Sequence, residues 1–400
     1  MTHGNLNNFN PNDDEDIKNI KNFEKIIKSS ISKINLDLTD LIILTEAATG
    51  NWISTPLIAS FANAKQVICI SKDTKYGKSF DIQKNFKQIA SYFDITDKIH
   101  VFDKLDSKLI SKADIVTNSG HVRPIDRKFI DAMKKTAVIT LMWEPWEFRS
   151  NELDLSYCWI KGISILGVNE DNNILNVMQY TGKNILKIFS NHNISINNKK
   201  IILVGENRSI FPMISFLIKN GAVIYIVSST LKNQLQKLGM KIIGEKLSES
   251  KLSQFLKICD IILINSAPIH SDVIGGKTGL SISKLQSLNP NVIIVVYFGA
   301  VDYQQIKKHK INCYPNNEVK QGYMSWTLDF LGPQPTIELN CLGLKVGEIL
   351  AKNRLSGLDP KNTEKKSLES GFCLDFSEEQ KRKFGYYTNE YSYQTWLQKY

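Results

Sequence analysis

Short apolar runs alternate with amphipathic segments along most of the chain, and this alternation predicts an α/β fold. The apolar runs are rich in Ile, Val and Leu and end in glycine or small polar residues, as buried strands do. The segments between them repeat apolar residues at helical spacing. Strands that alternate with helices in this way indicate parallel sheets with helices on both faces. The predicted strands are residues 41–44, 66–71, 99–102, 115–118, 137–142 and 163–168, then 201–204, 223–227, 241–243, 261–264, 292–296 and 311–314.

This order of elements predicts two doubly wound, Rossmann-like domains with parallel sheets, joined by long helices. The 400 residues and the hydrophobic content of 42% suffice for two separate cores. We expect a flexible leader at residues 1–38, an N-terminal substrate domain at 39–172, a connecting helix at 173–190, a dinucleotide-binding domain at 191–337, and a returning helix with an aromatic C-terminal tail at 338–400.

Composition narrows the class of protein further. The net charge is +10, but the lysines are spread along the chain among Asp and Glu, so we expect no nucleic-acid partner. The basic excess favours an anionic small molecule instead. The apolar runs are much shorter than the roughly 20 residues of a membrane helix, and the first residues lack an apolar signal core, so we expect a cytoplasmic protein with no membrane contact. The six scattered cysteines form no CxxC pair, which predicts neither a metal site nor a disulfide framework.

The most informative motif begins at residue 201, where an apolar strand is followed by a turn, a helix and a second strand. This sequence of elements opens a dinucleotide-binding fold, in which the helix N-terminus attracts phosphate. The first glycine of the fingerprint is present, whereas Asn207 and Ile210 stand at the second and third glycine positions. A tight turn without a ligand is the alternative interpretation. The predicted cofactor loop is Gly205, Glu206, Asn207, Arg208 and Ser209.

The second strand of this domain ends in hydroxyl side chains and a lysine, where NAD enzymes usually carry Asp or Glu for the ribose. Ser228, Ser229 and Lys232 would suit a 2′-phosphate, so the sequence favours NADP over NAD. Serines after a strand are also ordinary helix caps. The ends of the fourth and fifth strands are expected to complete the cofactor site with Asn265, Ser266, Tyr297 and Gly299.

Polar clusters also follow several strands of the first domain. An imidazole at His121 is suited to proton transfer near neutral pH, and the guanidinium of Arg123 to clamping a carboxylate. The loop at residues 142–149 carries two Trp and two Glu, of which Glu144 is expected to orient a polar substrate. A capping loop and an aromatic plug are the alternatives for these two regions. The predicted catalytic residues are His121, Arg123 and Glu144, and the predicted substrate-binding residues are Glu46, Thr49, Asn51, Ser119, Gly120, Trp143 and Asn169.

Two successive doubly wound domains with a connecting and a returning helix resemble the D-2-hydroxyacid (formate/glycerate) dehydrogenases and, distantly, S-adenosylhomocysteine hydrolase. Residues 152–167, ELDLSYCWIKGISILG, resemble the family's pattern D-L-x-x-C/A-x-x-x-G-I-x-V. The resemblance implies an NAD(P)-dependent oxidoreductase and a homodimer. The chain departs from the family after the fifth strand, where it has Tyr297 and Phe298 in place of the catalytic Arg. It departs again three residues before Trp326, where Tyr323 stands in the place of the family's His.

We therefore expect an NAD(P)-dependent oxidoreductase that acts on a small polar, carboxylate-bearing substrate in a cleft between two domains. Two alternatives stay open. One is a hydrolase or lyase with a tightly bound nucleotide, as in S-adenosylhomocysteine hydrolase, and the other is a non-catalytic nucleotide-binding protein with a degenerate cofactor site. A cofactor retained through purification would favour the first alternative, and failure to bind any dinucleotide would favour the second.

Overall fold

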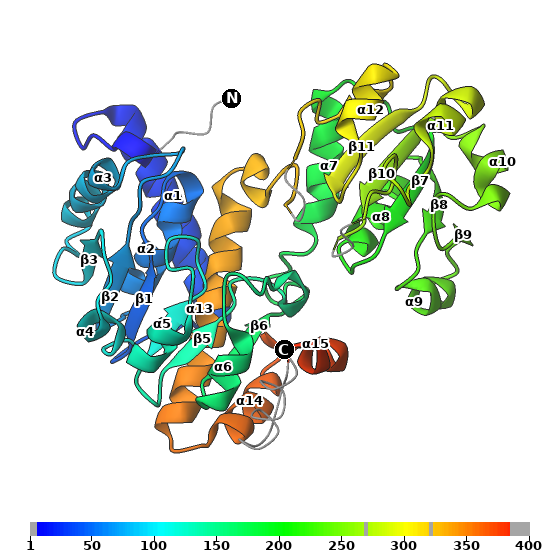
Figure 1. The fold of residues 1–400 in the computed structure, drawn as a ribbon. Helices are drawn as coiled ribbons and strands as arrows, with labels where there is room; N and C mark the ends of the chain where they lie inside the picture. The colour runs from blue at the N-terminus through cyan, green and yellow to red at the C-terminus, as the bar shows by residue number, and fades with distance from the viewer. Residues whose placement is uncertain (1–5, 268–270, 320–322, 385–400) are drawn as a thin grey trace. The chain divides into compact units, whose positions relative to one another are not determined.

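The chain forms two compact units in the computed structural model, which describes residues 6–267, 271–319 and 323–384 (Figure 1). Unit 1 is discontinuous and comprises Met1–Val177 and Gly332–Tyr400, whereas unit 2 is the intervening segment Met178–Leu331. Each unit is built on a mostly parallel sheet whose strands alternate with helices along the chain. The predicted fold class of two Rossmann-like α/β domains is therefore confirmed.

The sheet of unit 1 has the strand order β13-β6-β5-β4-β1-β2-β3, and only β13 runs antiparallel to its neighbour. Alternate residues of its strands face opposite sides, and both sides are apolar because helices cover both. Its strands are β1 (Ile42–Glu46), β2 (Gln66–Ile70), β3 (Ile99–Phe102), β4 (Ile115–Thr117), β5 (Val138–Thr140), β6 (Ser164–Val168) and β13 (Cys373–Leu374).

Helices α1, α2 and α13 pack together and cover one face of this sheet, and α4, α5 and α6 cover the other. Glycine allows helix α13 to pack closely on the sheet. A Cβ at Gly343 would lie only 2.6 Å from Sδ of Met142. The helices of unit 1 are α1 (Asp14–Ile34), α2 (Ser54–Phe61), α3 (Ser79–Tyr92), α4 (Ser107–Ile110), α5 (Arg127–Ala132), α6 (Leu155–Ile160), α13 (Pro333–Leu355), α14 (Pro360–Leu368) and α15 (Glu378–Lys383), with the 3₁₀ helices η1 (Leu6–Asn8), η2 (Gly50–Ile53) and η3 (Pro145–Glu147).

The sheet of unit 2 has the order β12-β11-β10-β7-β8-β9, with all strands parallel. Its first strand, β7, therefore lies between the second (β8) and the fourth (β10), which is the order of a dinucleotide-binding fold. The strands are β7 (Lys200–Gly205), β8 (Val223–Val227), β9 (Ile242–Gly244), β10 (Ile261–Asn265), β11 (Ile293–Phe298) and β12 (Asn312–Tyr314). The helices are α7 (Tyr180–Asn191), α8 (Ile210–Lys219), α9 (Lys232–Lys237), α10 (Ser253–Leu256), α11 (Ile282–Leu288) and α12 (Tyr303–Lys308), with η4 (Ser250–Leu252) and η5 (Leu328–Leu331).

Most of the segment expected to be a flexible leader is instead a packed helix. Asp13 caps α1 by accepting from the N–H groups of Glu15 and Asp16, and the helix buries Ile20, Phe23 and Ile27. Helix α1 packs on α13, which returns from the far end of the chain. The segment is rich in Asn, Asp and Lys and has a single apolar stripe, and this composition is why the sequence predicts a flexible leader.

The connecting helix begins later than the sequence predicts, at Tyr180. Before it, the side chain of Asn172 accepts from the N–H of Ile174 at 2.8 Å, and Asp171 forms an isolated bridge with Asn176. These local contacts satisfy backbone groups in a non-helical conformation, and the helix therefore begins only after them. The helical spacing of apolar residues nevertheless extends into this non-helical segment.

The beginning of the aromatic tail packs on unit 1. The ring centroid of Phe148 lies 5.8 Å from that of Phe376 and 4.9 Å from that of Phe384. Phe376 also packs edge-on against Trp159. The remaining aromatic residues of the tail, from Tyr386 to Tyr400, lie outside the described residues.

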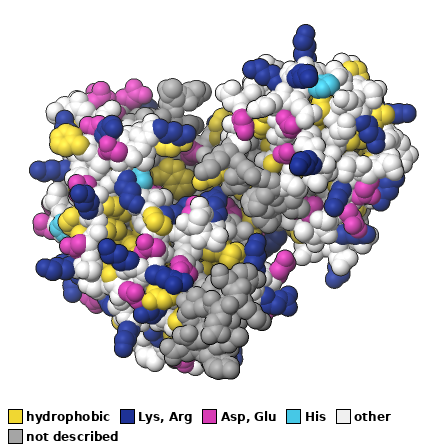
Figure 2. Space-filling model, viewed as in Figure 1, with side chains coloured by type: hydrophobic (Ala, Val, Ile, Leu, Met, Phe, Trp, Pro, Cys, Tyr) yellow, Lys and Arg dark blue, Asp and Glu magenta, His cyan; other side chains and the backbone are white. Residues whose placement is uncertain are grey.

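Charged side chains of both signs lie on the surface, and the cysteines are buried. Figure 2 shows Lys and Arg side chains scattered over the visible face and interspersed with Asp and Glu. None of the described helices is long and apolar enough to cross a membrane. All six cysteines are buried and free, and among the described residues no group of three or more His, Cys, Asp or Glu side chains could hold a metal ion.

Candidate functional site

The predicted residues of unit 1 meet where β1 and β4 lie side by side, at the carboxyl ends of the strands. Strand order reverses at this point of the sheet, and ligands of open α/β folds bind at such points. Oε2 of Glu46, the last residue of β1, accepts from the N–H of His121 at 2.9 Å. A Cβ at Gly120 would stand 3.3 Å from the same oxygen. The structure therefore brings Glu46, Gly120 and His121 together.

The ring of His121 is fixed by contacts of one nitrogen. Its Nδ1 lies 3.1 Å from the carbonyl oxygen of Ala47 and 3.3 Å from the backbone nitrogen of Lys72. Beside it, the hydroxyl of Thr117 donates to that of Thr45 and contacts that of Ser119, each at 2.8 Å. Because Nδ1 faces the backbone, Nε2 is the nitrogen that can serve a ligand.

Arg123 is bound to groups of the protein itself. Its Nε donates to the carbonyl of Asn118, and its Nη1 lies 2.6 Å from Oε1 of Glu152. The guanidinium also stacks on Trp143, with 4.5 Å from Cζ to the ring centroid. Burial lowers the pKa of Arg123, and the carboxylates of Glu152 and Glu46 oppose this shift. Arg123 thus supports the site with a charge that Glu152 already balances.

The loop after β5 holds two carboxyl groups close together. Nε1 of Trp146 donates to Oε2 of Glu144 at 2.7 Å, so Glu144, which is buried, is held within its own loop. Burial, and then the neighbouring Glu144 carboxylate, raise the pKa of Glu147. Nε1 of Trp143 is buried without a hydrogen-bond partner among the described residues.

Three other predicted substrate residues lie apart from this group. Nδ2 of Asn169 donates to the carbonyl of Gly371 at 2.9 Å, so this side chain ties β6 to the segment before β13. Thr49 precedes η2, and its Cγ2 would lie 3.0 Å from a Cβ at Gly77. Asn51 lies within η2, next to Gly50, whose N–H donates to Oδ1 of Asn7 at 2.5 Å.

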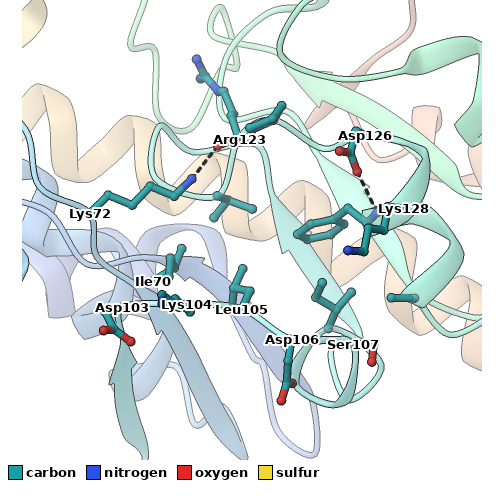
Figure 3. A pocket seen from close by; sticks show the side chains of 15 residues that line it. Ile70, Lys72, Asp103, Lys104, Leu105, Asp106, Ser107, Arg123, Asp126 and Lys128 are labelled. Carbon is teal, nitrogen blue, oxygen red and sulfur yellow. Dashed lines mark hydrogen bonds between the residues drawn. The ribbon is translucent and has the colours of Figure 1, made fainter.

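A cavity of about 700 Å³ opens at the carboxyl ends of β2 and β3 and reaches the loop after His121 (Figure 3). Its floor is apolar, and around it stand two lysines from the loops after β2 and β3 and one from α5. Nζ of Lys72 donates to the carbonyl of Arg123 at 2.7 Å, and burial lowers the pKa of Lys72. The lining includes Lys72, Lys104, Lys128, Asp106, Asp126 and Phe129.

Two of the acidic residues at this cavity are occupied as helix caps. Asp106 accepts from the N–H of Leu109 at 2.8 Å, and Asp126 accepts from the N–H of Phe129 at 2.9 Å. These bonds hold the two carboxylates at the starts of α4 and α5. The volume of this cavity and its mostly apolar lining are within the usual range of small-molecule sites, and the three lysines favour an anionic ligand.

The predicted cofactor residues of unit 2 also meet at the point where strand order reverses. Gly205 ends β7 opposite Asn265, the last residue of β10, and the N–H of Glu206 donates to the carbonyl of Asn265 at 3.2 Å. Oδ1 of Asn265 and Oγ of Ser266 are buried without a partner among the described residues. Buried polar atoms normally find a partner, so these two indicate where a polar ligand can bind.

The loop itself is closed by its own side chains. Oδ1 of Asn207 accepts from the N–H of Ser209 at 3.0 Å, and its Nδ2 donates to the carbonyl of Ala267 at 2.8 Å. A Cβ at Gly205 would overlap Ile210, which fills the space left by the glycine missing from the fingerprint. The loop therefore keeps the tight turn but offers a phosphate less room than the full fingerprint would.

Glu206 reaches from this loop to the end of the neighbouring strand β8. Its carboxylate accepts from the N–H groups of Ser229 and Thr230, at 3.1 and 2.9 Å, and from both of their hydroxyls. Ser228 lies further away, with Oγ 3.5 Å from Oε2. The two serines assigned to a 2′-phosphate thus lie around a carboxylate of the protein.

Several other predicted cofactor residues make their contacts away from this loop. Lys232 pairs with Glu245 at 3.0 Å on the surface. The buried hydroxyl of Tyr297 accepts from Nδ2 of Asn184 at 3.3 Å, which directs this ring towards α7. Gly299 has φ +155° and leaves room for Ser266 beside it. Tyr323 is 41% exposed, and residues 320–322 before it lie outside the described part of the chain.

The sequence analysis missed four residues that contact the predicted ones. Thr230 belongs with Ser228 and Ser229, and its position next to them was a sufficient signal. Glu147 lies in the loop already selected for Glu144. No local pattern joins Glu152 to Arg123 or Lys72 to His121, because the fold brings these segments together.

Known structures share this fold. The dipicolinate synthase A chain from Bacillus subtilis matches with a TM-score of 0.51 and 11% sequence identity, over 81% of this chain and 100% of that one. A putative D-3-phosphoglycerate dehydrogenase from Ralstonia solanacearum matches with a TM-score of 0.45 and 9% identity, over 82% and 100%. D-Lactate dehydrogenase with NAD⁺ from Lactobacillus jensenii matches with a TM-score of 0.41 and 14% identity, over 71% and 96%.

At these identities the likeness concerns the fold alone. The plan of two Rossmann-like domains, which the sequence predicts, is confirmed at that level. No protein-family model matches the chain, and no curated protein matches it in sequence.

Proposed function

We propose that this chain is a nicotinamide-dependent oxidoreductase with its cofactor site on unit 2 and its substrate site on unit 1. The observation that carries the proposal is the carboxyl end of β7 and β10, where the turn at Gly205 adjoins the unpartnered buried atoms of Asn265 and Ser266. A dinucleotide has ribose and amide groups that can satisfy such atoms. A bound nicotinamide would supply or accept the hydride of the reaction.

The substrate site would combine His121 with the cavity beside it. The imidazole would exchange a proton through Nε2, since the contacts of Nδ1 hold the ring and the N–H of His121 is anchored on Glu46. Lys72 takes over the role of anionic anchor that the sequence predicts for Arg123, because Arg123 is paired with Glu152. The substrate class is therefore a small polar molecule that carries a carboxylate.

Titration of the full chain with NADH, followed by calorimetry, tests this proposal. We expect saturable binding, weakened several-fold in Arg208→Ala, because Arg208 follows the turn at the start of α8 and can contact a phosphate. Arg382→Ala in α15 of unit 1 is the matched control and should bind as the unchanged chain does. Absence of binding by the folded chain would exclude an oxidoreductase of this type.

One observation favours a second candidate, a nucleotide-binding protein without catalysis. Asn207 uses the N–H of Ser209 that a phosphate would otherwise take, and Ile210 narrows the loop. Binding of NADH without turnover of any hydroxy or oxo acid would support this candidate. The hydrolase or lyase alternative stays a prediction, for which a nucleotide retained through purification is the test. The homodimer also stays a prediction, which the mass from light scattering checks.

A further inference from the structure

Glu206 is a buried carboxylate set among donors from a different strand. It is 7% exposed, and its two oxygens receive the N–H groups of Ser229 and Thr230. The hydroxyls of these residues add bonds of 3.0 and 2.8 Å. Carboxylates that accept backbone N–H groups in this way are held strongly and in a fixed direction.

For cofactor binding, the position of the Glu206 carboxylate in the fold matters more than the strength of its hydrogen bonds. In dinucleotide-binding folds the acid for the adenosine ribose stands at the end of the second strand, which is β8 in this unit. Here β8 is followed by Ser228, Ser229 and Thr230, and none of them is acidic. The acid at the end of β8 comes instead from Glu206, which directly follows Gly205 at the end of β7.

We propose that Glu206 determines cofactor specificity by selecting a dinucleotide with a free 2′-hydroxyl over one with a 2′-phosphate. This inference rests on the proposed function and gives it NAD rather than the NADP favoured by the sequence. Ribose hydroxyls can donate to Glu206 when the rotatable hydroxyls of Ser229 and Thr230 turn aside. A 2′-phosphate would face a buried negative charge at the same place.

The groups that a 2′-phosphate would need are already in use. The N–H groups of Ser229 and Thr230 point at Glu206, as their distances of 3.1 and 2.9 Å show. The lysine assigned to the phosphate, Lys232, is bound to Glu245 at 3.0 Å. Binding of a phosphate would therefore require displacing Glu206 and breaking its bonds to the backbone.

Calorimetric titration with NADH and with NADPH tests the inference on the full chain. We expect the unchanged chain to bind NADH at least tenfold more tightly than NADPH. Glu206→Gln removes the charge at nearly constant size, and it should reduce this ratio about tenfold, mainly by strengthening NADPH. Lys232→Ala should leave both affinities unchanged, since this lysine is not at the ribose.

Glu249→Gln is the matched control. Glu249 also accepts two backbone N–H groups in unit 2, those of Glu245 and Lys246, at 2.6 and 2.7 Å, but it stands after β9. Its loss should not change the ratio of affinities. Equal binding of the two dinucleotides to the unchanged chain would overturn the inference while leaving the proposed function intact. Binding of neither would overturn both, and neither result depends on whether a variant folds.

Discussion

Gly347 of α13 lies so close to Ile115 of β4 that a Cβ at Gly347 would stand 2.6 Å from Cγ2 of the isoleucine. Replacing a glycine by alanine inside a helix usually stabilises it by about 1 kcal/mol. Here we expect Gly347→Ala to destabilise unit 1 by about 2 kcal/mol, because the new methyl overpacks the central strand. Unfolding followed by hydrogen exchange in peptides of α13 and β4 measures the change.

The double variant Gly347→Ala/Ile115→Ala provides the control for this effect. Ile115→Ala alone should cost about 2–5 kcal/mol through the cavity it leaves. The added methyl at Gly347 partly fills that cavity, so the double variant should lose less than the sum of the single losses. Strict additivity would show that the two residues do not press on each other.

A second prediction separates a buried ion pair from an exposed one. The side chains of Arg123 and Glu152 are 15% and 14% exposed, so Arg123→Met leaves the Glu152 carboxylate short of its main partner. We expect a loss of about 3 kcal/mol in the free energy of unfolding of unit 1. Arg127→Met removes a pair with Asp154 whose side chains are 53% and 31% exposed, and should cost less than about 1 kcal/mol. Similar losses in the two variants, measured with denaturant, would contradict the assignment.

A third prediction concerns pH. Burial raises the pKa of Glu364 in α14 from 4.5 to about 7. The N–H of Ile165, which donates to this carboxyl group at 3.0 Å, acts in the opposite direction and lowers the pKa. The folded state therefore holds this proton more tightly than the unfolded state. The contribution of the proton is fully present below pH 4.5 and is lost as pH rises through 7.

Glu364→Gln should remove this dependence. A shift of this size corresponds to about 3 kcal/mol, so at pH 8 the variant should be more stable than the unchanged chain by an amount of that order. Glu378→Gln, at a side chain that is 82% exposed, is the control and should not alter the pH profile. Denaturant midpoints between pH 4 and 9 decide the point, and parallel profiles for the unchanged chain and Glu364→Gln would refute it.

The thiols give a fourth prediction. All six cysteines are buried, and burial raises the pKa of each of their thiols. The thiolate is the reactive form, so the folded chain should react with a disulfide reagent very slowly. The six thiols should all react after denaturation. Rapid reaction of the native chain would show that a unit opens readily.

The sequence was sufficient for the parallel strands, because each of the predicted apolar runs is a strand whose ends lie within about two residues of the predicted ends. It did not predict the short antiparallel strand β13. It also placed the site residues at the carboxyl ends of those strands, which is why Glu46 and His121 meet. It could not show how far a side chain reaches across the sheet. Glu206 lies 22 residues before Ser228 in the chain, and only the pairing of β7 with β8 brings them together.

The same limit explains the errors at Arg123 and in the N-terminal segment. Arg123 has the chemistry of an anion clamp, but the loop that carries Glu152 folds beside it and balances its charge. Helix α1 has one apolar stripe among many polar residues, and α13 supplies the surface on which this stripe packs. In both regions the deciding partner is distant in sequence, so local patterns gave no sign of it.

Because α13 packs on the sheet of unit 1 but follows unit 2 in the chain, it affects which unit can complete its fold first during translation. Strands β1 to β6 of unit 1 leave the ribosome first, but α13, which covers β4, β5 and β6, is made only after all of unit 2. Unit 2 is a continuous segment and has every strand of its sheet once residue 314 has emerged. Unit 2, in the middle of the chain, can therefore reach its native state during translation while the N-terminal part of unit 1 still waits for α13.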